Sequence, residues 1–104
     1  YYEQIVDILF ISNNQTVLRN CCSALNKLPF QSYRDGERLE LYLKFLENRD
    51  NKVALHAYSL YLLMPYVKQY PELKTEIIEL LTLHQDKKPG LQAAIRRFNK
   101  KTTP

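Results

Sequence analysis

The stretch from residue 51 to residue 65, NKVALHAYSLYLLMP, has the pattern that decides the fold. Between Lys52 and Met64 the polar side chains are Lys52, His56 and Ser59. They recur at i, i+4 and i+7 and therefore occupy one narrow stripe of a helix. Because a helix that is apolar on nearly every side is buried between neighbours, the stretch predicts a central helix in a helical stack.

The same stretch matches two others when the chain is shifted by 37 residues, without a gap, onto residues 14–28 and 88–102. Apolar residues recur at helical spacing in the three stretches, as Val17, Ala54 and Leu91, then Cys21, Tyr58 and Ile95, then Ala24, Tyr61 and Phe98. Repeats of this length, built from paired helices, are typical of α-solenoids. We therefore expect two full repeats, about 14–50 and 51–87, flanked by half repeats.

Apolar periodicity and helix-breaking residues predict about five to six antiparallel helices. We expect them near residues 2–12, 15–28, 37–48, 52–64, 71–83 and 89–101, with Asn14 capping the second. The third should bury Leu39, Tyr42, Leu43 and Leu46. Pro65 should end or kink the fourth helix, and Pro71 should begin the fifth. The fold class that follows is all-α, arranged as a right-handed α–α superhelix.

Three segments, residues 52–60, 70–73 and 88–98, resemble the HEAT/armadillo-like helical-repeat superfamily. The similarity is closest to small bacterial cytosolic HEAT-like proteins that have no assigned activity. It implies a cytoplasmic protein-binding scaffold. The chain starts at Tyr1 and its end helices lack polar caps, so we expect one unit that is a piece of a longer protein, or an oligomer formed through those helices.

Positive charge is concentrated at the C-terminal end of the chain. The net charge is +4, and the residues after Gln85 include six cations against the single Asp86. These cations, the candidate basic face, are Lys87, Lys88, Arg96, Arg97, Lys100 and Lys101. A face of this kind can follow phosphates without reading sequence, as in HEAT-like DNA-binding proteins. Nucleic-acid or polyanion binding is therefore the alternative to a protein scaffold.

Aromatic residues supply the second set of candidate contacts. The chain has eight tyrosines, and tyrosine is enriched at protein interfaces. Tyr66 and Tyr70 lie near an expected turn, where their rings could be exposed. Neither the two glycines, Gly36 and Gly90, nor the cysteines and histidines form a catalytic, phosphate-binding or metal-ligand pattern. We therefore expect no enzymatic activity, cofactor or metal, and the absence of any apolar run of about 20 residues predicts no membrane span.

Overall fold

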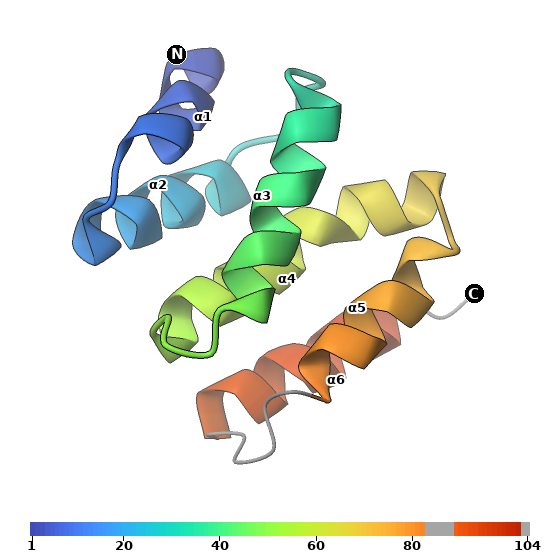
Figure 1. The fold of residues 1–104 in the computed structure, drawn as a ribbon. Coiled ribbons are helices and arrows are strands. Elements are labelled where there is room, and N and C mark those ends of the chain that lie inside the picture. Colours follow the sequence, from blue (N-terminus) through green and yellow to red (C-terminus); the bar gives the residue numbers. More distant parts are fainter. Residues whose placement is uncertain (83–88, 103–104) are drawn as a thin grey trace.

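The computed structural model of the chain describes residues 1–82 and 89–102. Within these residues the protein is all-helical, which confirms the predicted class. The helices are α1 (Tyr2–Ile11), α2 (Gln15–Lys27), α3 (Asp35–Glu47), α4 (Val53–Gln69), α5 (Leu73–Leu81) and α6 (Pro89–Thr102). Figure 1 shows their order along the chain. The radius of gyration is 12.8 Å, close to the value of about 13 Å expected for a folded domain of this length.

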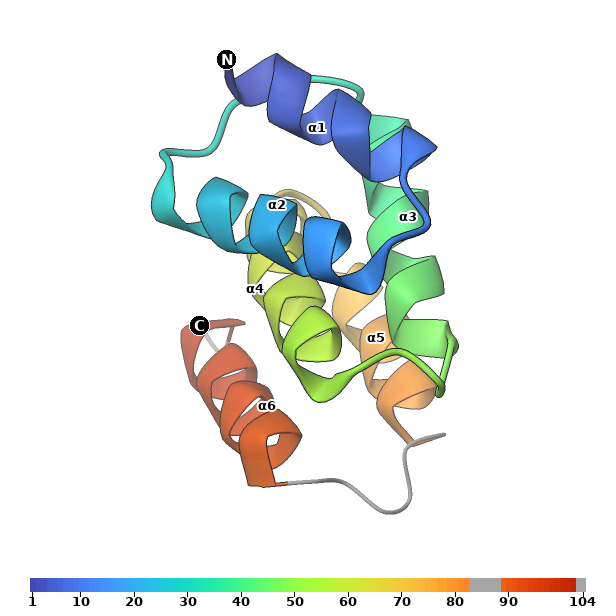
Figure 2. The ribbon, with the colours of Figure 1, turned by 90° about the vertical axis from the view of Figure 1, so that its left-hand side faces the viewer.

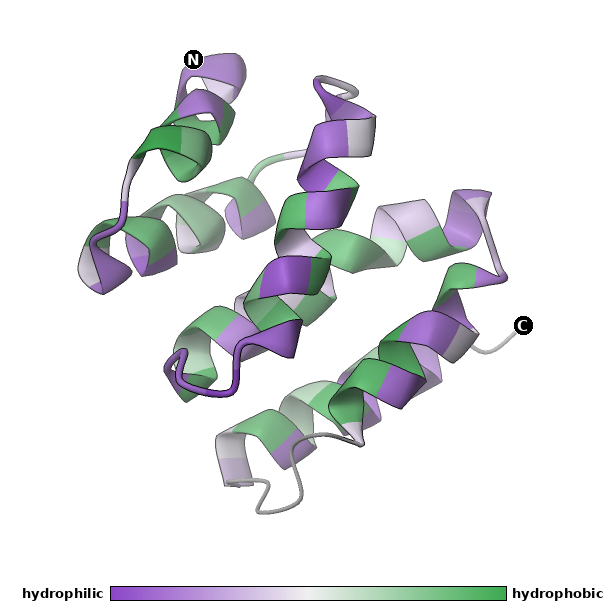
Figure 3. Ribbon diagram, in the orientation of Figure 1, coloured by the Kyte–Doolittle hydropathy of each residue, from purple (hydrophilic) through white to green (hydrophobic). Residues whose placement is uncertain are grey.

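The helix α4 is the centre of the molecule. It contacts α2 on one side and α6 on the other, and it also packs against α3 and α5. Figure 2 shows α2, α4 and α6 following one another down the view, with α3 and α5 beside them. In Figure 3 hydrophobic residues recur along most of α4, whereas polar and apolar residues alternate around α3 and α5. The prediction that residues 52–64 form a sandwiched helix is therefore confirmed.

The helix does not end at Pro65, which excludes one of the two outcomes expected there. α4 continues through Pro65 to Gln69, and α5 begins at Leu73, two residues after Pro71. An internal proline removes a backbone hydrogen bond and costs about 3 kcal/mol. The residues directly after it, Tyr66 and Val67, are only 2% and 4% exposed. Burying two such side chains recovers about 1.5–3 kcal/mol each, which offsets the proline.

The buried residues of α2 follow the 37-residue repeat onto α4, where Leu55, Ser59 and Leu62 are also buried, but they do not follow it onto α6. In α2 they are Leu18, Cys22 and Leu25, whereas Val17 is 38% exposed. In α6 the buried residues are Leu91, Ala94 and Phe98, and Leu91 is the repeat equivalent of Val17. Both helices contact α4, and Figure 2 shows them on opposite sides of it. Each therefore turns a different face toward its one neighbour in this layer.

The third helix buries Tyr42 and Leu46 as predicted, but its buried face also includes Arg38 and Phe45. Its buried residues are Arg38, Tyr42, Phe45 and Leu46, whereas Leu39 and Leu43 are only partly buried. The helix begins at Asp35, two residues earlier than expected, after Arg34 in the left-handed region (φ 51°). The buried face has the spacing i, i+4 and i+7 that is usual for a core-facing helix, formed here by Arg38, Tyr42 and Phe45. It is unusual only in that its first residue is charged.

Replacing Leu63 by alanine should lower the free energy of unfolding by about 2–5 kcal/mol. Leu63 is fully buried in α4, so its truncation leaves a cavity in addition to the lost apolar contact. Urea unfolding followed by circular dichroism measures the change. Ile78→Ala is the control, because Ile78 is 43% exposed and should change stability far less. A loss below about 1 kcal/mol for Leu63→Ala would contradict a tightly packed central helix.

Candidate binding sites

Four of the candidate cations gather on the outer side of α6. Arg96, Arg97, Lys100 and Lys101 are all exposed, whereas Leu91, Ala94 and Phe98 on the inner side are buried. The four cations line one open depression of about 500 Å³. No acidic residue occurs in α6, whose sequence is PGLQAAIRRFNKKT. The side chains of these four residues, the α6 basic face, therefore form a surface of one charge sign.

The α6 basic face is tied to α4 by an aromatic contact. The guanidinium carbon of Arg97 lies 5.0 Å from the ring centroid of Tyr61, within the range of a cation–π interaction. This contact restricts the long Arg97 side chain while leaving the residue exposed. Lys100 and Lys101 lie in the last turn of α6, where cations also stabilise the helix dipole. The remaining candidate cations, Lys87 and Lys88, lie outside the described residues.

The two candidate tyrosines have different environments. Tyr70 is 45% exposed and follows the end of α4, as predicted. Tyr66 is 2% exposed, so the prediction that it forms an exposed aromatic contact is wrong. The reason is that α4 continues past Pro65 and carries Tyr66 into the core, where its hydroxyl donates a 2.8 Å hydrogen bond to Asp35.

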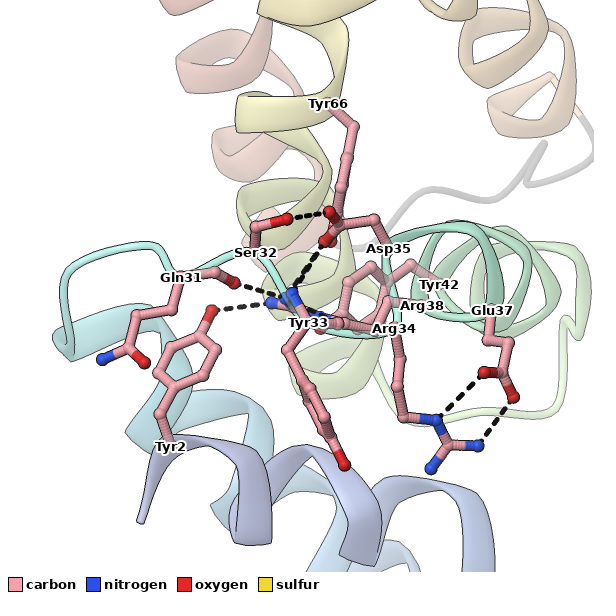
Figure 4. Close-up of polar contacts among 10 residues, drawn as sticks. All are labelled: Tyr2, Gln31, Ser32, Tyr33, Arg34, Asp35, Glu37, Arg38, Tyr42 and Tyr66. Carbon is pink, nitrogen blue, oxygen red and sulfur yellow. Dashed lines mark hydrogen bonds and ion pairs between the residues drawn. The ribbon is translucent and has the colours of Figure 1, made fainter.

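A cluster around Arg38 is the most polar part of the core. Arg38 is fully buried. Its Nη1 donates to the carbonyl oxygens of Gln31 and Tyr33, at 2.8 and 3.3 Å. Its Nη2 donates to the hydroxyl of Tyr2 at 2.7 Å, and its Nε donates to the hydroxyl of Tyr42 at 3.3 Å. Figure 4 shows these contacts converging from α1, from the α2–α3 loop and from α3 itself.

Aromatic rings surround the same guanidinium group. Its carbon lies 5.2 Å from the ring centroid of Tyr2, 5.4 Å from Phe30, 5.9 Å from Tyr42 and 5.7 Å from Tyr66. Phe30 and Tyr66 are themselves packed edge to face, with centroids 5.5 Å apart. A desolvated cation gains more from such faces than an exposed one. The rings therefore help to stabilise a charge that would be unfavourable in an apolar core.

Asp35 links this cluster to α4 and to the loop before α3. One of its oxygens accepts the hydroxyl of Tyr66 and lies 3.6 Å from Nη1 of Arg38, and the other accepts the hydroxyl of Ser32. Partial burial raises the pKa of Asp35, but these hydrogen bonds, the Tyr33 N–H and the charge of Arg38 together hold it below the ordinary 3.8. The carboxylate therefore stays charged near neutral pH.

A second, exposed ion-pair group joins the same loop to α1. Asp7 accepts hydrogen bonds from the hydroxyl of Tyr33 and from Arg34, and Arg34 also pairs with Glu37 at 2.7 Å. The hydrogen bond from Tyr33 is the main reason that the pKa of Asp7 lies below its ordinary value, followed by that from Arg34. The guanidinium of Arg34 lies 3.8 Å from the ring centroid of Phe10. The loop is thus fastened to α1 by charge and by packing.

Stability should fall as the pH is lowered from about 5 through the depressed pKa values of Asp7 and Asp35. In that range the unfolded chain binds more protons than the folded one, because the pKa values of both carboxyls are lowered in the folded protein. Urea unfolding midpoints measured at intervals of pH test this expectation. Asp35→Asn should flatten the pH dependence, whereas Glu40→Gln, an exposed carboxylate on α3, should not. Equal slopes for the two variants would contradict it.

Sequence reasoning did not single out Arg38, Tyr2, Phe30 or Asp35. The signal available for Arg38 was its place on the stripe with Tyr42 and Phe45, but a charged residue on such a stripe is usually assigned to the surface. The partners come from far along the chain, since Tyr2 lies 36 residues from Arg38 and Tyr66 lies 31 residues from Asp35. Their meeting depends on the packing of helices.

The remaining chemically reactive residues form no site among the described residues. Cys21 is partly buried and Cys22 is buried, and neither is in a disulfide. Burial, reinforced by the neighbouring Cys21, raises the pKa of Cys22 to about 12, so its thiol is protonated at neutral pH. Across residues 1–82 and 89–102, histidine, cysteine and acidic side chains form no group of three that could hold a metal ion. In the same ranges, no helix combines the length and apolar character that crossing a membrane requires.

Comparisons with known proteins add no relative. No protein-family model matches the chain, and no curated protein or solved structure is significantly similar to it.

Proposed function

We propose that this protein binds polyanions, with the phosphate backbone of nucleic acid as the favoured class, through the α6 basic face. The observation that supports the proposal is the set of four exposed cations that line one depression of about 500 Å³. A surface that neutralises several phosphates releases counterions, and this release supplies most of the affinity for nucleic acid without reading its sequence.

The charges of the other helices also favour α6 as the side of the protein that meets a polyanion. α3, DGERLELYLKFLE, has four acidic residues against two basic ones, and α5 with its N-cap Glu72 has three acidic residues against Lys74. These surfaces repel a polyanion, whereas α6 attracts it. Packing of α6 also contributes, since its buried residues Leu91, Ala94 and Phe98 hold the helix against α4. The proposal requires no catalytic residue.

Binding should weaken steeply with salt. If four phosphates are contacted, the logarithm of the association constant should fall with the logarithm of salt concentration with a slope of about −3.6 for duplex DNA and about −2.8 for a single strand. Fluorescence anisotropy with labelled random-sequence duplex and single-stranded oligonucleotides, between about 50 and 200 mM salt, measures this slope. A flat salt dependence, or no binding at the lowest salt, would contradict the proposal.

The second candidate function is a non-catalytic scaffold for protein partners. It rests on apolar residues exposed on α1 and near the start of α2, of which Ile11 is 81% exposed and Val17 is 38% exposed. Exposed apolar residues are frequent at protein interfaces. The finer arrangement implied by the resemblance, a HEAT-like right-handed superhelix in the cytoplasm, belongs to this proposal. The order of α2, α4 and α6 in one layer supports it. Failure of the salt-titration experiment would leave the scaffold as the remaining function.

A further inference from the structure

A pocket of about 170 Å³ lies next to the Arg38 cluster and apart from the α6 basic face. Its lining includes Leu25 and Asn26 from α2, Leu62 and Pro65 from α4, and the ring of Phe30 from the loop between α2 and α3. Tyr2 and Arg38 also line it, and both are almost completely buried. Asn26 is exposed, so it marks the solvent side of the pocket, and Arg38 and Tyr2 mark its inner side.

The inner side of the pocket has more hydrogen-bond donors than acceptors. A guanidinium group has five N–H donors, and four of those of Arg38 are used by Tyr42, Gln31, Tyr33 and Tyr2. One N–H of Nη2 therefore has no acceptor among the described residues. The hydroxyl oxygen of Tyr2 accepts from Arg38, and its own proton has no acceptor there either. Buried donors without acceptors are unfavourable, so this side of the pocket favours a ligand that brings acceptor oxygens.

The negative charge near Arg38 lies on only one side of its guanidinium group, as far as the described residues show. Asp35, the carboxylate nearest to Arg38, lies on the Nη1 side at 3.6 Å, and its oxygens already accept from Ser32, from Tyr66 and from the Tyr33 backbone. The Nη2 side faces Tyr2. Arg38 is also the one charged residue among the described residues that line the pocket. An anionic acceptor is therefore favoured over a neutral one on the Nη2 side.

The size and lining of the pocket limit the rest of the ligand. An engineered apolar cavity of about 150 Å³ in another protein holds benzene, and this pocket is slightly larger. Its walls contribute leucine and proline carbons and the ring of Phe30, which favour an apolar body. We propose that the pocket binds a small carboxylate with an aromatic or branched apolar body, whose oxygens accept from Nη2 of Arg38 and from the hydroxyl of Tyr2. This proposal is independent of polyanion binding by α6.

Titration of the ¹⁵N-labelled protein with sodium benzoate, followed by amide chemical shifts, tests the proposal. We expect saturable shifts, with a dissociation constant on the order of 1 mM or lower, centred on residues 25–30 and 61–66. Benzyl alcohol has the same ring without the charge and should bind at least about tenfold more weakly. Because the loss of Arg38 is expected to lower the stability of the whole fold, the test variant is Asn26→Trp, which covers the solvent side of the pocket.

Asn26→Trp should weaken benzoate binding at least about tenfold, because a tryptophan at this place excludes the ligand by volume. Asn20→Trp is the matched control, since Asn20 is also exposed on α2 but does not line the pocket. It should leave the affinity unchanged. Three results would each overturn the proposal: absence of saturation, equal affinity for benzyl alcohol, or shifts confined to α6, which would show benzoate on the basic face instead.

Discussion

Replacing Arg38 with alanine is expected to lower the free energy of unfolding by about 2–5 kcal/mol, the range measured when a large, fully buried side chain is truncated to alanine. The substitution leaves the carbonyl oxygens of Gln31 and Tyr33 without their donor. It also leaves Asp35 without the nearest positive charge. The space vacated by the side chain lies among the rings of Tyr2, Phe30, Tyr42 and Tyr66, so a cavity adds to the loss.

The phenol groups of the cluster reinforce this expectation. Burial raises the pKa of Tyr42 to about 12, and burial together with the hydrogen bond to Asp35 raises the pKa of Tyr66. Both hydroxyls are therefore protonated at neutral pH. Neither can supply a negative charge that would replace the role of Asp35 in pairing with Arg38. The cluster depends on Arg38 as the buried cation that joins α1, the α2–α3 loop and α3.

Urea unfolding of Arg38→Ala and of Lys44→Ala, followed by circular dichroism, measures the difference. Lys44 is an exposed cation on the same helix, and alanine is at least as good a helix former as lysine. The control should therefore change stability by no more than about 0.5 kcal/mol. A loss below about 1 kcal/mol for Arg38→Ala would show that the buried cluster contributes little net stability, as occurs for some buried ion pairs.

The second large effect is expected on binding. Reversing Arg96, Arg97, Lys100 and Lys101 to glutamate should weaken nucleic-acid binding by about two orders of magnitude or more at low salt, because favourable phosphate contacts become repulsive. Helical content should remain nearly unchanged, since all four residues are exposed. A modest loss at the end of α6 follows from placing acidic side chains near the negative end of the helix dipole. Replacing the same four residues with glutamine removes the positive charge without adding negative charge near the end of the helix. This variant therefore separates the dipole effect from the loss of positive charge.

The matched control reverses four exposed cations elsewhere, Lys27, Lys44, Arg49 and Lys68. Both quadruple variants change the net charge from +4 to −4, so long-range electrostatics change by the same amount. The control should reduce affinity far less than the α6 variant if binding is local to α6. Equal losses would show that net charge, and not the α6 basic face, drives binding. A cooperative loss of helix in the α6 variant would show that its cations are structural.

The sequence by itself determined the helices, the central place of residues 52–64 and the exposed cations of α6. Each of these follows from a local rule, the spacing of apolar residues on a helix of 3.6 residues per turn. Thus Leu91, Ala94 and Phe98 on one side of α6 place Arg96, Arg97, Lys100 and Lys101 on the other. The tertiary structure alone decided that α4 continues through Pro65, because the buried contacts of Tyr66 with Asp35 and Phe30 offset the lost hydrogen bond.

The tertiary structure also decided that Arg38 is a core residue. Local pattern assigns an arginine to the surface, since burying an isolated charge is unfavourable. That assignment fails when distant parts of the chain supply acceptors and aromatic faces, as Tyr2, Gln31 and Tyr66 do. Helical periodicity reports which side of a helix is apolar, but it contains no information about which groups from other helices will meet a polar side chain. Only the packing of α1, α3 and α4 around the α2–α3 loop brings them together.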